Sequence, residues 1–339
     1  LGTLLLMAVL LSAVLRFYQR FYSVLSHVEG RLKDLSGADL HEPQNLGSIT
    51  ASLGTTASDE LGSLCNTVGT LGKNLGSNLN TLLEEVSRSS GEHAAVQAIR
   101  AMQLQLMPRA EDMPTARFID IGAYLIPCRN RNCGDFYDIF RIDKDNVVFV
   151  IGTVSDKGIS ALRYIGVLLT MMRKALMLEG LRPAEALNFI HRNLGGGREG
   201  NKTTISIMAF ILSEFTGNFI MANAGFRNPM PIHMGMAREL TLQTGPPLLR
   251  DPAVVYTDIK SKLDYGDTML IYSDGIGYAK NEADEVYSPR QLSKLLEHCA
   301  PQSSPEILQA LNHNLRTFAG ARELTEDMTA ICIKKDGVD

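Results

Sequence analysis

The sequence lacks several features that would assign it quickly to a functional class. It has no lysine- and arginine-rich run, and its formal net charge is −4, which argues against a nucleic-acid-binding surface. Its five cysteines are scattered, odd in number and without a C-x-x-C pair, which fits a reducing compartment and argues against structural zinc or a disulfide framework. No G-x-S-x-G elbow supports a serine hydrolase, and the seven histidines show no metal-ligand spacing.

The apolar stretch at the start is shorter than a full membrane span. Residues 1–15 are almost wholly apolar and uncharged, whereas a transmembrane helix needs about 20 residues. Arginines interleaved with aromatic residues follow, as is typical of a membrane interface, and this positive flank places the next segment in the cytoplasm. We therefore expect residues 1–22 to be the end of a transmembrane helix and the chain to be a fragment. A signal peptide and a buried soluble helix are the alternatives.

Two amphipathic patterns come next. Apolar residues recur at helical spacing over residues 23–35 and again over residues 61–86, with a Gly/Ser/Thr-rich connector between them. Neither apolar stripe can be buried by its own helix alone. We therefore expect the helices to pair with copies from a second subunit in a parallel bundle, which predicts a homodimer.

This region, residues 23–78, resembles a HAMP domain, the two-helix relay that follows a membrane helix in bacterial sensors. The stretch Asp59-Glu60-Leu61-Gly62 matches the D-E-x-G start of the second HAMP helix, although the usual proline of the first helix is absent. The resemblance implies a relay role for Asp59, Glu60 and Gly62. It also implies a bacterial inner or cell membrane location with the later domains in the cytoplasm. An ordinary dimeric coiled coil is the alternative.

Residues 79–107 continue as a signalling helix that ends before Pro108, because proline cannot continue a helix. The final region, residues 108–339, contains both strand and helix patterns. Strands are predicted at 118–126, 147–151, 205–212, 218–222, 254–259, 268–272 and 329–334. Helices are predicted at 159–181, 183–194, 289–299 and 305–318. Because strands arrive consecutively with helices bunched between groups of them, we expect an α+β domain of antiparallel sheets covered by helices.

Aspartates recur at strand edges and glycine turns in this final region. Asp135 follows a glycine, Asp274 directly follows an apolar strand, and Asp327 directly precedes one. Hard cations such as Mg²⁺ and Mn²⁺ take oxygen ligands, and carboxylates at strand ends can converge on them. The pattern therefore predicts a divalent-cation site.

The order of these motifs resembles the SpoIIE/RsbU branch of the PPM protein phosphatases. The resemblance covers residues 103–336 and is carried by Met107-Pro108, Cys133-Gly-Asp-Phe-Tyr-Asp138, Val154-Ser-Asp-Lys-Gly-Ile-Ser-Ala161, Asn223-Ala-Gly225, Gly266-Asp267, Tyr272-Ser-Asp-Gly275 and Asp327-Met-Thr329. It implies an α-β-β-α sandwich and a two-metal Mn²⁺ or Mg²⁺ centre that hydrolyses phosphoserine or phosphothreonine. By motif position, Asp135, Asp274 and Asp327 would be the metal ligands and catalytic residues. The implied partner is a phosphorylated STAS-type or anti-sigma-like regulator.

The chain departs from that family at the expected site. Thr153 stands where the family has the aspartate that bridges the two metals, Phe226 replaces a histidine, and Tyr278 replaces an acid. Two dications about 4 Å apart repel by roughly 16 kcal/mol at an effective dielectric of about 20, and a hydroxyl offsets little of this. One ion, or none, is therefore the alternative to two.

Two residues next to Thr153 are further candidates. Asp156 is near enough in a tight turn to bring its carboxylate into the place of the missing acid, or else it caps the following helix. Lys157 is a candidate for contacting the phosphate. Two functions without turnover stay open beside the phosphatase: a pseudophosphatase that binds a regulatory partner, and a structural part of a dimeric membrane receptor.

Overall fold

The structure, a computed structural model, describes residues 92–128, 134–194, 202–242, 244–323 and 325–336. The chain divides into two units, Leu1–Ser87 and Arg88–Asp339, and every described residue belongs to the second. The predicted membrane segment and the HAMP-like region, with Asp59, Glu60 and Gly62, lie outside the described residues. Of the helices that the structure does describe, none combines the length and the apolar character needed to cross a bilayer.

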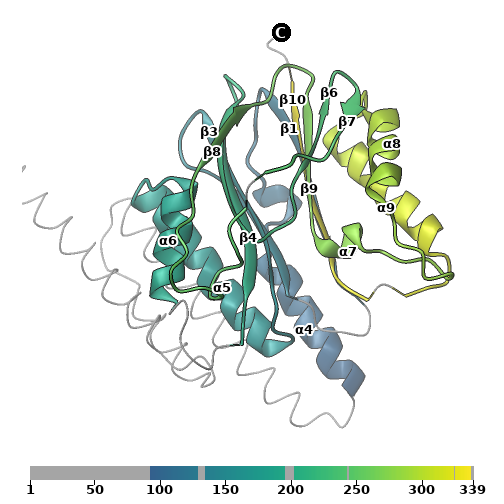
Figure 1. The fold of residues 1–339 in the computed structure, drawn as a ribbon, viewed down its shortest axis with the longest axis horizontal. Coiled ribbons are helices and arrows are strands. Elements are labelled where there is room, and N and C mark those ends of the chain that lie inside the picture. Colours follow the sequence, from purple (N-terminus) through teal and green to yellow (C-terminus); the bar gives the residue numbers. More distant parts are fainter. Residues whose placement is uncertain (1–91, 129–133, 195–201, 243, 324, 337–339) are drawn as a thin grey trace, which may run out of the picture. The chain divides into compact units, whose positions relative to one another are not determined.

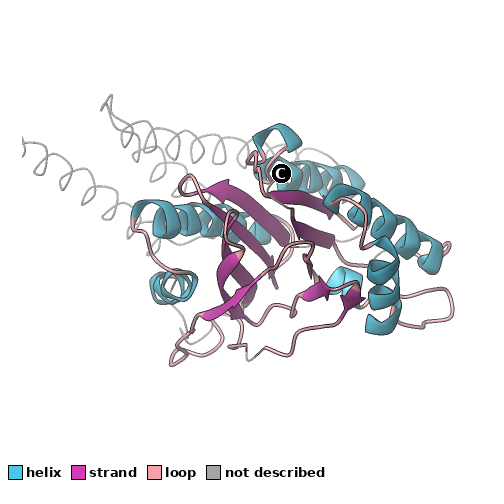
Figure 2. Ribbon diagram, turned by 90° about the horizontal axis from the view of Figure 1, so that it is seen from above, coloured by secondary structure: helices cyan, strands magenta, loops and turns pink. Residues whose placement is uncertain are grey.

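Two antiparallel sheets of five strands lie between two layers of helices (Figures 1 and 2). The first sheet has the order β1-β10-β9-β6-β7 and the second β2-β3-β4-β5-β8. The strands are β1 (Ile119–Ile126), β2 (Asp135–Arg141), β3 (Asn146–Val154), β4 (Ile205–Ser213), β5 (Asn218–Ala224), β6 (Met230–His233), β7 (Met236–Ala237), β8 (Ile259–Lys262), β9 (Thr268–Tyr272) and β10 (Met328–Lys335). The predicted sandwich of antiparallel sheets is confirmed.

Helices cover the outer face of each sheet. Helices α5 (Ile159–Arg173) and α6 (Pro183–Asn193) pack on the second sheet, and α8 (Pro289–Cys299) and α9 (Ser304–Ala319) pack on the first. Helix α4 (Glu92–Leu106) packs beside α5. The sequence marked two of these starts clearly, because proline occupies the first position of α6 and α8, and Ser288 caps α8 by accepting from the Gln291 amide.

The central strands are buried on both faces. Strands β3 and β4 pair over their whole length. Every residue of Val147–Ile151 in β3 and of Ile207–Phe210 in β4 is buried, so neither run shows the alternation of buried and exposed residues that marks a half-exposed strand. A strand with helices on one side and a second sheet on the other has no water-facing side, so both of its faces are apolar. This is why these runs were recognisable in the sequence.

Two predicted elements differ from the structure. The strand predicted at 254–259 begins only at Ile259, because the backbone of Tyr256 is bound by the Asn188 side chain of α6, through its N–H at 2.9 Å and its carbonyl at 3.0 Å. The helix predicted at 159–181 leaves α-helical geometry after Arg173 and finishes as a π-helical turn, Lys174–Leu178. Short elements are decided by such tertiary contacts more than by local propensity.

Candidate functional site

The predicted aspartates Asp135 and Asp327 meet where the two sheets approach each other. Asp135 is the first residue of β2, and Asp327 directly precedes β10 of the other sheet. The backbone N–H of Asp135 donates to Asp327 Oδ2 at 3.3 Å, and both side chains are buried. Two acids that are 192 positions apart in sequence are therefore brought together by the sandwich.

The Asp135 carboxylate is held by hydroxyl groups. Thr153 lies opposite Asp135 in the β2–β3 register and donates to its Oδ1 at 2.6 Å, while Thr329 donates to its Oδ2 at 2.7 Å. Burial raises the pKa of Asp135 well above its usual range, and the neighbouring charge of Asp327 raises it further. The hydroxyls of Thr153, Thr329 and Ser273 oppose this rise in pKa only in part.

The Asp327 carboxylate is held from the opposite side by α4. Gln103 donates from Nε2 to Asp327 Oδ2 at 2.6 Å and to the Asp135 carbonyl at 2.8 Å, and the Cys128 N–H donates to Asp327 Oδ1 at 2.9 Å. Gln103 is buried in this position. Sequence reasoning missed Gln103, because a glutamine within a charged helix carries no local signal of a partner 224 positions away.

Glycines allow the backbone to approach the acids closely. A side chain added at Gly275 would clash with the carbonyl of Asp327, and one added at Gly134 would clash with the carbonyl of Val154. The glycines of two of the resembling motifs are thus explained by close backbone packing at the site and not by turn geometry alone.

The third predicted ligand, Asp274, lies at the solvent side of the same site. It is the first residue of α7 (Asp274–Gly277), its side chain is 61% exposed, and Arg227 binds its Oδ1 through Nη2 at 3.0 Å and Nε at 3.1 Å. The guanidinium also lies over the ring of Tyr278, 4.6 Å from its centroid. Sequence reasoning missed Arg227, although it directly follows the motif Asn223-Ala-Gly-Phe226.

One small pocket is lined by two of the three predicted aspartates and not by Asp327. Its volume is about 120 Å³, and Asp135 and Asp274 line it from opposite sheets together with Arg227. Glu326 adds a further acidic side chain to its lining, and Thr153, Ser155, Thr204 and Ser206 add hydroxyl groups. The pocket therefore offers anionic and neutral oxygen atoms and one guanidinium to a small, charged ligand.

Two other predicted site residues, Asp156 and Lys157, do not line this pocket. The Asp156 carboxylate accepts from the Ser160 hydroxyl at 2.6 Å, an interaction within the turn that leads into α5. The capping alternative is not confirmed, because Gly158 is the N-cap of α5 and no side chain caps its N–H groups. A metal-ligand role for Asp156 stays a prediction. Lys157 is exposed, and its role toward phosphate likewise stays a prediction.

The residues present fit one divalent ion better than two. No three acidic, histidine or cysteine side chains within the described ranges are already arranged around a common metal position. Asp135, Asp274 and the pocket hydroxyls nevertheless supply the oxygen donors that Mg²⁺ and Mn²⁺ prefer. A second ion does not fit, because Thr153 replaces the anionic bridge and already directs its hydroxyl proton to Asp135.

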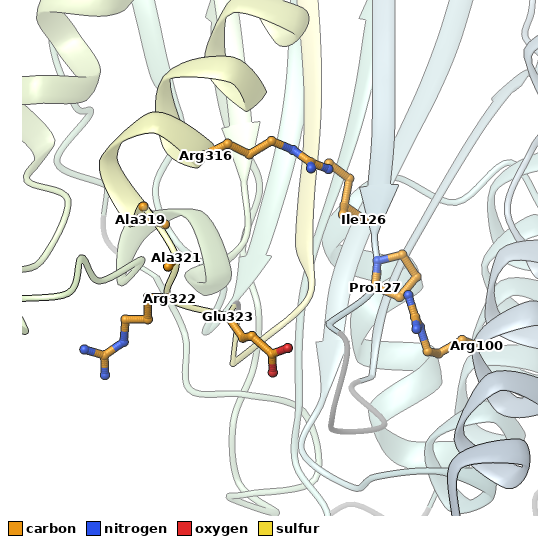
Figure 3. Close-up of a pocket in the computed structure, with 9 residues that line it drawn as sticks. Arg100, Ile126, Pro127, Arg316, Ala319, Ala321, Arg322 and Glu323 are labelled. Atoms are coloured by element: carbon orange, nitrogen blue, oxygen red, sulfur yellow. The ribbon is translucent and has the colours of Figure 1, made fainter.

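A larger cavity lies elsewhere, between the C-terminal end of α9 and α4. Its volume is about 400 Å³, and Arg100, Arg316, Arg322 and Glu323 are among the residues that line it (Figure 3). None of the three predicted aspartates lines it, and Arg322 is already bound to Asp284 at 2.8 Å. The smaller acidic pocket is therefore the better candidate for the predicted chemistry.

Comparison with known proteins identifies the family of the chain. The family model of stage II sporulation protein E (SpoIIE) matches residues 143–336. Protein IcfG of Synechocystis sp. is 22% identical over 283 residues, which cover 76% of this chain and 44% of that protein. Phosphoserine phosphatase RsbU of Bacillus subtilis is 23% identical over 227 residues, which cover 66% of this chain and 65% of that protein. The match thus spans less than two thirds of either relative.

Solved structures show the same fold. The SiaA-PP2C domain of Pseudomonas aeruginosa superimposes with a TM-score of 0.61 at 18% identity, covering 72% of this chain and 96% of that one. The PP2C phosphatase domain of SpoIIE from Bacillus subtilis gives a TM-score of 0.57 at 14% identity, covering 65% and 64%. At these identities, the likeness concerns the architecture of the sandwich.

Proposed function

The chain belongs to the SpoIIE family of PP2C-type phosphatases, and from that premise we propose that its folded domain is a protein serine/threonine phosphatase. Its proposed substrate is a phosphorylated regulatory protein of the STAS or anti-sigma-like type. The name of its relative RsbU, a phosphoserine phosphatase, supports phosphoserine as the group that is hydrolysed.

One observation carries this proposal. Asp135, drawn from the second sheet, lies against Asp327 of the first sheet and lines the same pocket as Asp274. Two buried acids and one exposed acid, far apart in the sequence, thus lie at or beside one pocket, and acids with strongly shifted pKa values gather in this way mainly where they have a functional role.

Different side chains of the pocket would contact the phosphoryl group and orient the acids. The hydroxyls of Ser155, Thr204 and Ser206 can donate to phosphoryl oxygens, and Thr153 and Thr329 fix the orientation of Asp135. Gln103 fixes Asp327 in the same way. A Mn²⁺ or Mg²⁺ ion held by Asp135 and Asp274 would supply Lewis-acid chemistry to the phosphoryl group and to water.

Phosphate release from a phosphoserine peptide in the presence of Mn²⁺ tests this function. We expect release by the wild-type chain and loss of release in Asp135→Asn. The variant Thr153→Asp restores the acid found in the family, so it shows how far Thr153 limits turnover. No release by the wild-type chain at any Mn²⁺ concentration would contradict the proposal.

A pseudophosphatase that binds a regulatory partner is the second candidate. It is favoured by the contacts of Thr153 and Arg227, which occupy oxygen atoms of Asp135 and Asp274. Strong phosphate release by Thr153→Asp and none by the wild-type chain would favour this second candidate, because the fold and the remaining site would then be competent without being used.

We also propose membrane attachment and regulation through the preceding segments. The sequence pattern supports a membrane anchor at residues 1–22, a dimeric HAMP-like relay at 23–78 and a signalling helix at 79–107. Helix α4 lies within the range proposed for that signalling helix, and its Gln103 contacts both buried aspartates, so a displacement of α4 would change the site. Membrane fractionation of the chain in a bacterial cell, and of a variant lacking residues 1–22, tests the anchor.

A further inference from the structure

A permanent cation already lies in the pocket. The Arg227 side chain is only 13% exposed, and it binds Asp274 Oδ1 through two nitrogen atoms at 3.0 and 3.1 Å. Arginine stays protonated at every pH that a folded protein tolerates. One of the predicted metal ligands is thus neutralised by the chain itself.

Several features hold this guanidinium in place. It lies 4.6 Å from the Tyr278 ring centroid and 5.5 Å from that of Tyr272, distances at which a cation and an aromatic ring attract. A side chain at Gly277 would clash with it. The turn before it is closed by Asn223, which accepts from the Phe226 N–H at 2.8 Å and donates to the Phe226 carbonyl at 2.9 Å.

The differences from the family pattern at the site all make the local charge more positive. Relative to the pattern of the family that the motifs resemble, Thr153 lacks a negative charge where the two ions would be bridged, and Tyr278 lacks another beside Arg227. Arg227 adds a positive charge in the same pocket. Each change weakens the attraction of the pocket for two dications, because less negative charge is left to offset their repulsion.

We propose that the guanidinium of Arg227 takes the place of one of the two divalent ions, so that the site holds at most one ion and presents Arg227 to the phosphoryl group. The inference rests on the proposed function, because it concerns the same pocket. The planar guanidinium suits this role, since its N–H groups match the spacing of phosphate oxygens.

Titration calorimetry with Mn²⁺ tests the inference without relying on turnover. We expect at most one ion per chain in the wild type, in Thr153→Asp and in Arg227→Lys, which all keep the positive charge. The double variant Thr153→Asp/Arg227→Gln should bind two. Arg227→Gln alone should bind its ion more tightly, by a factor on the order of ten, because a neighbouring like charge is removed.

The control is Arg290→Gln, which removes the same charge from the exposed surface of α8 and should leave Mn²⁺ binding unchanged. Two ions in the wild type or in Thr153→Asp would overturn the inference, as would a single ion in the double variant with native circular dichroism. If the glutamine variants do not fold, the wild type, Thr153→Asp and Arg227→Lys still decide between one ion and two.

The same proteins separate this inference from the proposed function. Phosphate release by the wild type together with two bound ions would overturn the role of Arg227 and leave the phosphatase intact. One bound ion without phosphate release would leave the role of Arg227 as the cation and remove the turnover claim.

Discussion

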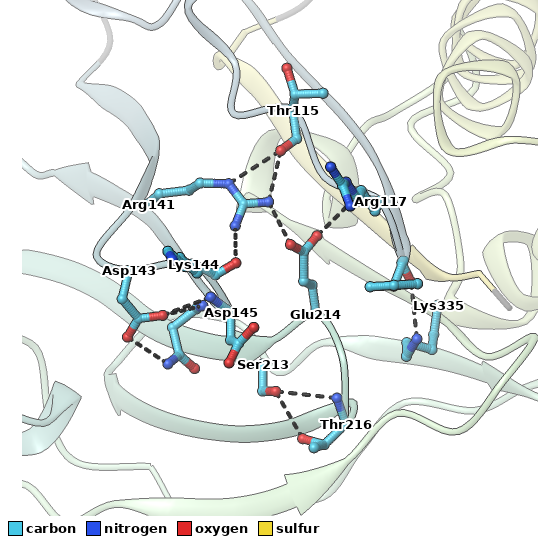
Figure 4. Close-up of polar contacts among 12 residues, drawn as sticks. Thr115, Arg117, Arg141, Asp143, Lys144, Asp145, Ser213, Glu214, Thr216 and Lys335 are labelled. Carbon is cyan, nitrogen blue, oxygen red and sulfur yellow. Dashed lines mark hydrogen bonds and ion pairs between the residues drawn. The ribbon is translucent and has the colours of Figure 1, made fainter. Parts of the chain in front are cut away.

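Two buried acids lie at opposite ends of the same sheet and have different kinds of partner, a cation for one and neutral hydroxyl groups for the other. Glu214, directly after β4, accepts from Arg141 Nη2 at 2.7 Å and from the Arg117 N–H at 2.9 Å (Figure 4). Asp135, at the other end of the sheet, is held by the neutral hydroxyls of Thr153 and Thr329. Within the described part of the chain, the first acid has a counter-ion and the second has none.

A third acid shows that the difference is not a matter of position along one strand. Asp138 lies on β2 three residues after Asp135, and each is only 3% exposed. Asp138 is bound by two nitrogen atoms of Arg173, both at 2.7 Å, and faces α5. Within one strand, Asp138 is thus neutralised by an arginine, whereas Asp135 has only neutral partners and can bind a cation that enters the site.

This contrast has a thermodynamic meaning. A buried carboxylate without a cation is costly, and the raised pKa of Asp135 records that cost. The site end of the sandwich therefore gives up stability that the other end keeps. Functional sites commonly show this trade between stability and activity.

The largest expected effect on stability follows from removing Arg141, the counter-ion of Glu214. Arg141→Met should lower the free energy of unfolding by about 3 kcal/mol, because Glu214 loses the cation that is hydrogen-bonded to it and keeps only the charge attraction of Lys335. Urea unfolding measures this loss. Adding Glu214→Leu should return most of it, and Arg290→Met is the exposed control. A loss below about 1 kcal/mol for Arg141→Met would show that the comparison misjudges this pair.

A smaller loss is expected when backbone packing at the site end is disturbed. Gly275→Ala should cost about 1–3 kcal/mol, because the new methyl group meets the Asp327 carbonyl. The same variant should weaken Mn²⁺ binding, since Asp274 and Asp327 must separate. Urea unfolding and calorimetry measure the two effects, and unchanged values for both would mean that this end of the sandwich is not tightly packed.

Neutralising each acid of β2 should change stability in opposite directions. Asp135→Asn should raise the free energy of unfolding at pH 7 by about 1 kcal/mol in the absence of metal, because a destabilised carboxylate is removed. Asp138→Asn should lower it, because Arg173 loses its partner. Thermal unfolding with a chelator present compares the two. The same sign for both variants would contradict the distinction between them.

The smallest effect concerns a buried base. His191 is 2% exposed, its Nδ1 accepts from the Leu249 N–H at 3.2 Å, and burial lowers its pKa from 6.5 although Asp251 opposes this. Its stabilising effect is thus complete above pH 6.5 and is lost as the pH falls through the lowered pKa. We expect the thermal stability of His191→Gln to vary less between about pH 7 and 5 than that of the wild type. Equal pH dependence of both proteins would contradict this.

Local sequence predicted most of the elements but not the strand that matters most for the site. Strand β9 and helix α8 were predicted with the bounds that the structure shows. Strand β2 was missed, because its two aspartates interrupt the apolar pattern that marks a buried strand. Those aspartates are buried only because partners from other elements, Thr329 and Arg173, reach them.

The sequence by itself determined the α+β class and the antiparallel sheets, because periodicity and proline positions can be read directly from it, and it predicted three acids as site residues. Only the tertiary structure decided which polar and charged groups meet. Gln103 reaches Asp327 and Arg227 reaches Asp274 across long separations in the chain. Electrostatic interactions depend on distance in space and on burial, and neither is written in the order of the residues.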